Sequence, residues 1–409
     1  MVMLETMQEY ARDRLEASGE AEEVRRRHAA YLVALAEAAE PELMGPHQGE
    51  WVQRLEAEHA NLRAVLTWSR EQAAWEVGLR LAGALWRFWE RHGHLSEGRR
   101  WLEGLLAQAG SNLPAGAGTV RAKALRAAAQ LAWRQDDYGQ AVALGEESLR
   151  LYREVGDRAG IAYSLNILAT VAWQQGDYAR ATALFEESLA LFRELGDKDG
   201  TAWVLINLGV IVGNQGDHGR AAALYREGLA LFRELGDNNG MGWALIGLGQ
   251  SARARGDAWQ ATVLFKESLA VFRGVEHKPG IGFALNCLGL ATCEQGDYGR
   301  ATALYAESLA LCRETGNKYL AAHCLEGLAG VASAQGQPER AARLFGAAEA
   351  TRRLIGVPLP PSERPHYERL VAAVRTQLDE GTFAAAWTAG QALSLEQAIA
   401  EALGEESSV

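Results

Sequence analysis

The sequence repeats itself with a period of 40 residues between positions 138 and 337. One copy reads YARATALFEESLALFRELGD from Tyr178, and the next reads HGRAAALYREGLALFRELGD from His218. Five copies follow one another without an insertion, and a decayed sixth copy covers residues 338–356. A fixed period of this length is typical of solenoids, in which each unit buries its apolar face by stacking on its neighbours. The chain is therefore predicted to form one array of stacked units.

Each 40-residue unit predicts two helices. In the second helix of one unit, Ala181, Phe185 and Ser188 recur at spacings of three and four, which places them on one apolar stripe. A Gly-Asp pair separates the two helices, as at 176–177, and another separates one unit from the next, as at 196–197. Glycine ends a helix in the left-handed conformation, and aspartate caps the helix that follows. Other glycines recur where two helices are expected to touch, at Gly209, Gly249 and Gly289.

The repeated pattern is Leu-x-x-Leu-Gly/Ala, followed by Gly-Asp-Tyr-x-x-Ala-x-x-x-Phe-x-x-Ala/Ser. It resembles the tetratricopeptide repeat signature, in a form with longer helices, and residues 138–337 match it five times. The resemblance implies an all-α, right-handed superhelical solenoid. It also implies that the first helix of each unit lines a concave inner face and that the second helix lies outside.

The flanking segments carry a second resemblance. They read LETMQEYARDRLEASGE from Leu4, ALWRFWERHGHLSEGRRWLEGLL from Ala84 and FAAAWTAGQALSLEQAIAEAL from Phe383. These segments are similar to the repeat arm that follows the nucleotide-binding core in bacterial STAND-type ATPase regulators, where a LuxR-type DNA-binding domain often comes next. The phosphate-loop motif GxxxxGK[ST] does not occur in the sequence, so nucleotide binding is not carried over. We expect the sensor arm alone.

The chain ends are expected to cap the array, because a solenoid leaves an apolar face exposed at each end. Residues 21–75 predict two amphipathic helices. After the break at 356–361, two more helices are predicted, over 363–379 and 382–403, with a capping box at Ser394 that restarts the second. The predicted organisation is a winged-helix remnant over 1–20, an N-terminal helical cap over 21–75, degenerate repeats over 76–137, regular repeats over 138–337, a decayed repeat over 338–356, and a C-terminal helical cap with a short acidic tail over 357–409.

Charge and hydropathy exclude several classes of protein. A net charge of −11 argues against a nucleic-acid-binding surface, which needs clustered Lys and Arg. No apolar run is long enough to span a membrane, and the N-terminus lacks the apolar core of a signal peptide. We therefore expect a cytoplasmic protein without membrane partners. The four cysteines have no metal-binding spacing and are interpreted as reduced thiols.

A candidate ligand groove follows from columns of equivalent positions on the first helices. One column is aromatic, and Asn166 and Asn286 lie three residues beyond it on the same helix face, where an amide can both donate to and accept from a peptide backbone. Trp173 and Arg253 occupy a position that varies freely between units, as expected for a surface facing solvent or ligand. The aromatic column consists of Tyr163, Trp203, Trp243, Phe283 and His323. Packing between units would also require periodic aromatics, and we weigh packing and binding equally.

No constellation of catalytic residues emerges from the sequence. Recurring Glu and Arg columns, such as Glu227 and Arg193, repeat identically along the array, so we interpret them as ion pairs between units or as charges that solvate the outer helix. No metal-ligand set is expected, and the histidines of the N-terminal part are predicted at helix surfaces or turns: His28, His47, His59, His92 and His94.

The predicted function is a non-catalytic binding module without cofactors. Its partner would be a protein or peptide on the concave face, with a small-molecule ligand as a further option, within a bacterial signalling or transcription regulator. The alternative is a constitutive scaffold or self-association module whose groove stays empty. Self-association into an oligomer is compatible with either.

Overall fold

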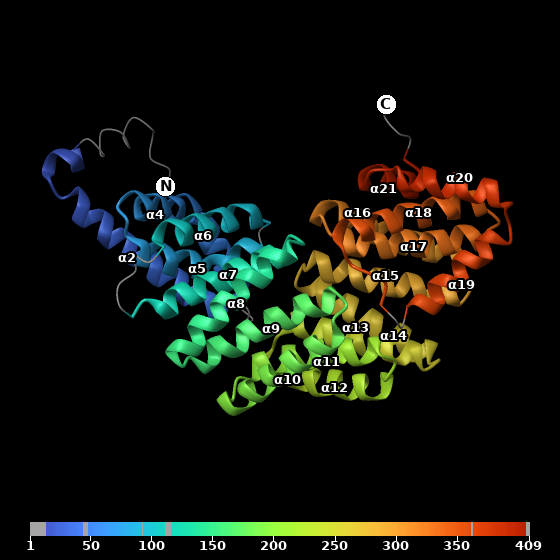
Figure 1. The fold of residues 1–409 in the computed structure, drawn as a ribbon, viewed down its shortest axis with the longest axis horizontal. Coiled ribbons are helices and arrows are strands. Elements are labelled where there is room, and N and C mark those ends of the chain that lie inside the picture. The colour runs from blue at the N-terminus through green and yellow to red at the C-terminus, as the bar shows by residue number, and fades with distance from the viewer. Residues whose placement is uncertain (1–13, 44–47, 92, 111–115, 361–362, 406–409) are drawn as a thin grey trace. The chain divides into compact units, whose positions relative to one another are not determined.

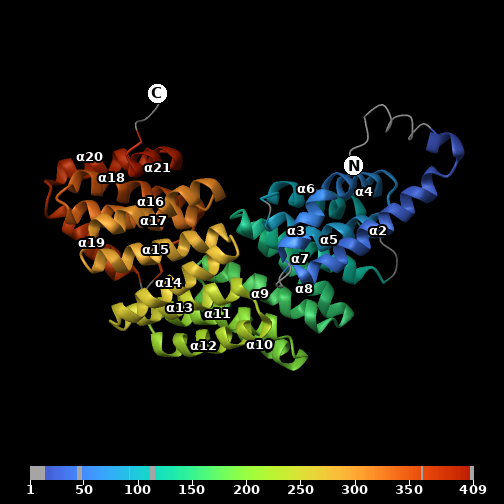
Figure 2. The ribbon, with the colours of Figure 1, turned by 180° about the vertical axis from the view of Figure 1, so that it is seen from behind.

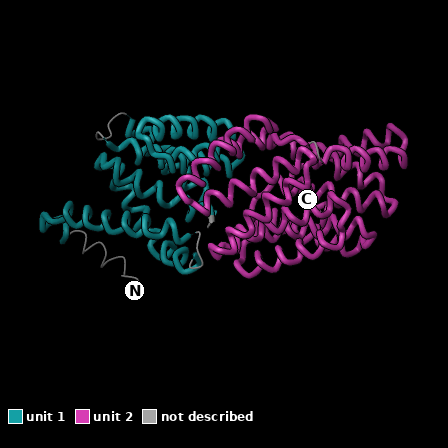
Figure 3. The backbone as a smooth tube through the Cα atoms, turned by 90° about the horizontal axis from the view of Figure 1, so that it is seen from below, with its two compact units in different colours: residues 1–167 teal, residues 168–409 magenta. Residues whose placement is uncertain are grey.

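The computed structural model describes residues 14–43, 48–91, 93–110, 116–360 and 363–405. The regular elements in these ranges are helices that pack in successive pairs, which confirms the all-α repeat fold. The winged-helix remnant predicted over 1–20 lies largely outside the described residues. The chain divides into two compact units, residues 1–167 and 168–409 (Figure 3).

Unit 1 begins with a helical layer built on α2 and α5. The described helices are α2 (Ala21–Glu42), α3 (Gln48–Ala57), α4 (His59–Glu71), α5 (Trp75–Arg91), α6 (Leu95–Ala109), α7 (Gly118–Arg134) and α8 (Tyr138–Val155), and α9 (Arg158–Gln174) starts in this unit. Trp89 is buried in its core, and a Cβ atom on Gly98 would lie 2.3 Å from the Trp89 ring, so helix α6 can approach only because this position is glycine. The prediction of two helices over 21–75 was wrong, because the chain breaks at Glu58 and forms α3 and α4 separately.

Unit 2 contains the regular repeats, each an inner and an outer helix (Figures 1 and 2). After the end of α9 come α10 (Tyr178–Leu195), α11 (Lys198–Asn214), α12 (His218–Leu235), α13 (Asn238–Ala254), α14 (Ala258–Gly274), α15 (Lys278–Glu294), α16 (Tyr298–Thr315), α17 (Lys318–Ala334) and α18 (Pro338–Ile355). From α10 to α18 each helix packs against the next along the chain, and the odd-numbered helices from α11 to α17 also contact one another. The shared core is therefore continuous from repeat to repeat.

The turns between helices follow the predicted chemistry. Gly176 adopts a left-handed φ of 82°, and Asp177 Oδ1 accepts a hydrogen bond from the Arg180 backbone N–H at 3.0 Å. The turn between units is built in the same way, with Gly196 at φ 68° and an Asp197 cap. The prediction that glycine stops one helix and aspartate caps the next is confirmed.

Close helix contacts occur where glycine was predicted to permit them. A Cβ atom on Gly249 would lie 2.4 Å from Phe265, and one on Gly289 would lie 2.9 Å from Tyr305. A Cβ atom on Gly209 would lie 2.7 Å from the ring of Tyr225. Because these rings are almost fully buried, the glycines let the inner helix rest on the aromatic ring of its partner helix.

The outer helices are linked by the predicted ion pairs. Arg193 Nη2 lies 2.8 Å from Glu227 Oε1, and Arg273 Nη2 lies 2.9 Å from Glu307 Oε1 in the equivalent position. These side chains are about half exposed, so each pair stabilises the fold by only ~0–1 kcal/mol. The prediction of ion pairing between units is confirmed.

Three helices, rather than the two predicted, form the C-terminal end of unit 2. They are α19 (Arg364–Arg375), α20 (Glu380–Gln391) and α21 (Leu395–Leu403). The predicted restart at Ser394 is confirmed, since Ser394 and Gln397 form a reciprocal capping box that makes α21 a separate helix. Among the described residues, no helix is both long and apolar enough to cross a membrane.

Candidate functional site

The predicted aromatic column lies on the inner helices, where its members pack against neighbouring rings. The Trp203 ring centroid is 5.0 Å from that of Phe232, and the Trp243 ring is 5.1 Å from Phe283 on the next inner helix. Both indoles are half-buried. In unit 1, Tyr163 lies under the Arg126 guanidinium, 5.2 Å from its ring centroid. These contacts are what packing requires, and ligand binding by the column stays a prediction.

The other predicted groove residues are also half-buried on the inner helices. Asn286 Nδ2 donates to Cys324 Sγ at 3.3 Å, and Arg253 Nη1 lies 2.8 Å from Glu294 Oε1 of α15. Asn166 and Trp173 are half-buried on α9. The structure thus brings Arg253 and Asn286 near further polar groups, while Asn166 and Trp173 lie at the start of the array.

A buried ion pair forms at the C-terminal end of the inner face. Arg352 of α18 donates to Glu326 of α17 twice, with Nε–Oε1 at 2.6 Å and Nη2–Oε2 at 2.8 Å. Its Nη2 also lies 3.2 Å from Nδ1 of His323, the last member of the aromatic column. The Arg352 side chain is 7% exposed, and its Nη1 is buried without a hydrogen-bond partner. The sequence signal was present, because Arg352 stands where earlier repeats have apolar residues.

A non-helical segment of the chain itself lies against this cluster. We call it the strap and define it as residues 357–360 together with Glu363, between α18 and α19. Pro358 reaches the turn between α9 and α10, where a Cβ on Gly176 would lie 3.6 Å from its Cγ. Glu363 Oε2 is 3.8 Å from His323 Nδ1. Figure 1 shows the chain leaving α18 toward the earlier repeats before α19 begins. The strap therefore contacts both the first and the last repeat of unit 2.

The strap places a titratable carboxyl beside Arg253, His323 and Arg352. Burial raises the pKa of Glu363 to about 7, and the guanidinium groups of Arg352 and Arg253 oppose this shift. The Glu363 side chain as a whole is 39% exposed, so it is partly open to solvent. Burial, aided by Arg352, holds the pKa of His323 well below its usual value, so this imidazole is neutral at pH 7. The groove thus offers cationic and neutral hydrogen-bonding groups around one acidic side chain.

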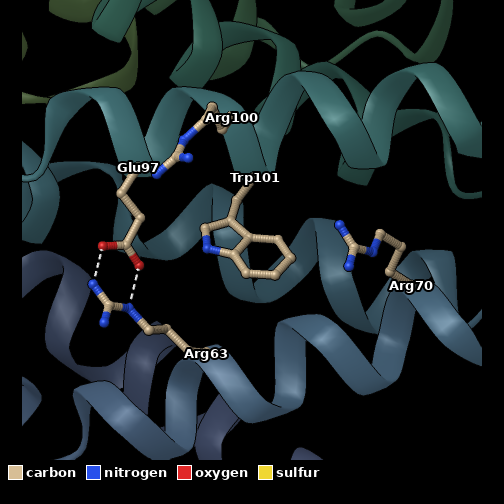
Figure 4. Close-up of a pocket in the computed structure, with 5 residues that line it drawn as sticks. All are labelled: Arg63, Arg70, Glu97, Arg100 and Trp101. Carbon is tan, nitrogen blue, oxygen red and sulfur yellow. Dashed lines mark hydrogen bonds and ion pairs between the residues drawn. The ribbon is translucent and has the colours of Figure 1, made fainter.

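Unit 1 carries a separate, basic depression of about 420 Å³ (Figure 4). Arg63 forms a two-bonded pair with Glu97, and the Arg70 guanidinium lies 5.4 Å from the centroid of the Trp101 ring. Arg100 completes the lining. These charged side chains pair with one another or face solvent. None of the residues that line the depression has a buried polar atom without a partner.

The prediction that the N-terminal histidines lie at surfaces or turns was wrong for His59. Its imidazole is buried, packs edge-to-face on Phe88 at 5.5 Å, and lies 4.7 Å from the ring of His94. Burial lowers the pKa of His59, so it is uncharged at neutral pH. His28 is exposed as predicted, whereas His47 and His92 lie outside the described residues.

Known proteins resemble this chain in its repeats and in its fold. A tetratricopeptide repeat model matches residues 158–234, 214–274 and 281–353. Two proteins, from Mycobacterium bovis and Mycobacterium tuberculosis, are provisionally named HTH-type transcriptional regulators. Each is 36% identical over 167 residues, which is 40% of this chain and 19% of the relative. The matched stretch therefore spans about a fifth of those relatives.

Solved structures share the fold at low sequence identity. The Rap conjugation gene regulator of plasmid pLS20, in complex with the Phr* peptide, superposes with a TM-score of 0.57 at 14% identity, over 80% of this chain and 98% of that one. The quorum sensor NprR from B. thuringiensis, in its apo form, gives a TM-score of 0.56 at 15% identity, over 86% and 93%. The tetratricopeptide repeat model thus matches residues 158–274 and 281–353 of the chain, and the solved structures share its all-α repeat fold.

Proposed function

We propose that the inner face of unit 2 is a regulatory binding groove for an extended peptide, and that the peptide exchanges with the strap. The observation that carries this proposal is the strap itself. A non-helical, proline-containing stretch of polypeptide already lies against the inner face, with Val357 and Pro360 buried. A surface that already packs against non-helical polypeptide supports the binding of a peptide segment in its place.

The groove's chemistry favours a peptide with an acidic side chain. Glu363 lies among Arg253, Arg352 and His323, so an acidic group of a ligand would meet the same partners. Arginine binds carboxylates through paired hydrogen bonds, and Arg352 retains a buried, unpaired Nη1. The same fold binds a peptide in the Rap complex with Phr*, which supports the choice of ligand class.

The role is non-catalytic in this proposal. Among the described residues, the proposed groove holds no nucleophile beside a base. Burial and the charge of Arg352 account for the shifted pKa values of His323 and Glu363. Binding would act by releasing the strap and the helix α19 that follows it. The mycobacterial relatives suggest that such a signal serves transcriptional regulation.

The test is a selection of binding peptides followed by affinity measurement. Twelve-residue peptides selected on the full chain are labelled, and their Kd is measured by fluorescence anisotropy for the parent, for Arg253→Ala and for Arg193→Ala as the matched outer-helix control. We expect at least a tenfold loss of affinity for Arg253→Ala and no change for Arg193→Ala. Equal binding by both variants, or no selected peptide, would favour the scaffold alternative with an empty groove.

A further inference from the structure

We propose that Glu56, His59 and His94 of unit 1 bind a divalent transition-metal cation of the zinc class. The ligand atoms of these three side chains all lie within 4.8 Å of one another. Glu56 Oε2 is 3.9 Å from His59 Nδ1 and 3.9 Å from His94 Nε2. Ligands around a tetrahedral zinc ion with bonds of about 2.0–2.1 Å lie about 3.3 Å apart. The three atoms lie farther apart than this, so their side chains would rotate toward one another to bind one ion.

A carboxylate lies behind His59, on the side of its Nε2. Its Nε2 lies 3.4 Å from Glu97 Oε1, while its Nδ1 faces Glu56. Glu97 is itself fixed by the two-bonded pair with Arg63. When Nε2 carries the proton toward Glu97, the Nδ1 lone pair is directed at Glu56 and His94. The buried His59 Nε2 has no hydrogen-bond partner, and a small ring rotation that lets it donate to Glu97 would supply the carboxylate support usual for zinc-bound histidine.

Different segments of unit 1 supply the three ligands. Glu56 lies near the end of α3, His59 begins α4, and His94 directly precedes α6. Gly93, with a left-handed φ of 77°, makes the turn that presents His94. A bound cation would therefore tie the α3–α4 corner to the start of α6.

The surroundings distinguish a bound ion from a chance encounter of polar groups. His59 is almost fully buried against Phe88, so its position is fixed by packing. The side chains of Glu56 and His94 are 45% and 32% exposed, which leaves a solvent route for the ion and room for water as a fourth ligand. Two imidazoles and one carboxylate suit zinc better than calcium or magnesium, which prefer oxygen ligands.

The test uses the full chain without an affinity tag, stripped with a chelator and titrated with Zn²⁺ alone. Affinity is measured by competition with a chromogenic chelator for the parent, for Glu56→Gln, for His94→Gln and for His28→Gln, an exposed histidine of the same unit. Because Glu56 and His94 are partly exposed, their variants are expected to fold, and circular dichroism checks this. We expect one Zn²⁺ per chain in the parent, a loss of affinity of at least tenfold in the two site variants, and no change in His28→Gln.

Replacement of Zn²⁺ by Co²⁺ distinguishes this site from the cysteines. We expect visible absorption of a nitrogen- and oxygen-ligated Co²⁺ ion without the intense near-ultraviolet bands of a cobalt–thiolate bond. The proposal is overturned if the parent binds no Zn²⁺, if the folded Glu56→Gln and His94→Gln variants bind as tightly as the parent, or if the bound Co²⁺ shows thiolate bands.

Discussion

The regular repeats of unit 2 and its C-terminal end use the same kind of ion pair in opposite surroundings. Arg193 and Glu227 pair on the outer helices with side chains that are 52% and 49% exposed. Arg352 and Glu326 pair on the inner face with side chains that are 7% and 12% exposed. The outer pairs recur from repeat to repeat and add little stability, whereas the inner pair occurs where the repeat decays and the strap docks. Departure from the repeat pattern therefore marks the candidate site.

The largest expected effect comes from removing the arginine of each ion pair in a separate variant. Arg352→Ala leaves Glu326 buried and uncompensated, and we expect the free energy of unfolding to fall by about 3–5 kcal/mol. Arg193→Ala removes an exposed partner and should cost ~0–1 kcal/mol. Urea unfolding followed by circular dichroism measures both. If both variants lose the same free energy of unfolding, burial does not make the Arg352 pair more important for stability than the Arg193 pair.

A second prediction concerns packing within the regular repeats. Gly249→Ala places a Cβ atom 2.4 Å from the buried ring of Phe265, so the helices must separate, and we expect a loss of about 1–3 kcal/mol. Gly299→Ala is the matched control, because an added Cβ meets nothing within 4 Å. It should leave stability unchanged or raise it by about 0.5–1 kcal/mol. Thermal unfolding of both variants checks the contrast, which fails if Gly249→Ala is neutral.

A third and smaller effect is the pH dependence of the strap. The folded-state pKa of Glu363 is raised to about 7, so the docked strap favours the protonated carboxyl. Stability contributed at this position is therefore highest at acidic pH, declines as pH rises through about 7, and is level above that. The groups that interact electrostatically with Glu363 are Tyr178, Arg253, Cys287, Tyr319, His323, Glu326 and Arg352.

The measurement compares unfolding free energies at pH 5.5 and pH 8 for the parent, Glu363→Gln and Glu227→Gln. We expect the decline between the two pH values to be smaller in Glu363→Gln than in the parent. Glu227, on an outer helix, should leave the decline unchanged. If the unfolding free energies of the parent and of Glu363→Gln change equally between pH 5.5 and pH 8, the Glu363 carboxyl does not contribute to the pH dependence of stability.

The contrast between the two regions also explains what the sequence could predict. The helix pairs, the Gly-Asp turns and the contact at Gly249 depend on local residues and a fixed period, so they follow from the pattern alone. The strap itself belongs to no period, and its partners Arg253 and His323 lie far from it in the chain, so their meeting depends on tertiary structure. Arg352 was the one visible signal, as a charge at an apolar position. In unit 1, the break at Glu58 buries His59 beside His94, and nothing in the spacing of these histidines indicates it.

The central claim is that a peptide and the strap compete for the same inner face, and a strap-weakening variant tests it most directly. Val357 is buried in the strap, whereas Leu354, three residues earlier on α18, is 71% exposed. The Kd of a selected peptide is measured for the parent, Val357→Ser and Leu354→Ser. Because strap docking reduces the fraction of chains open to a ligand, we predict tighter binding by Val357→Ser and no change for Leu354→Ser. Unchanged or weaker peptide binding by a folded Val357→Ser variant would contradict the account.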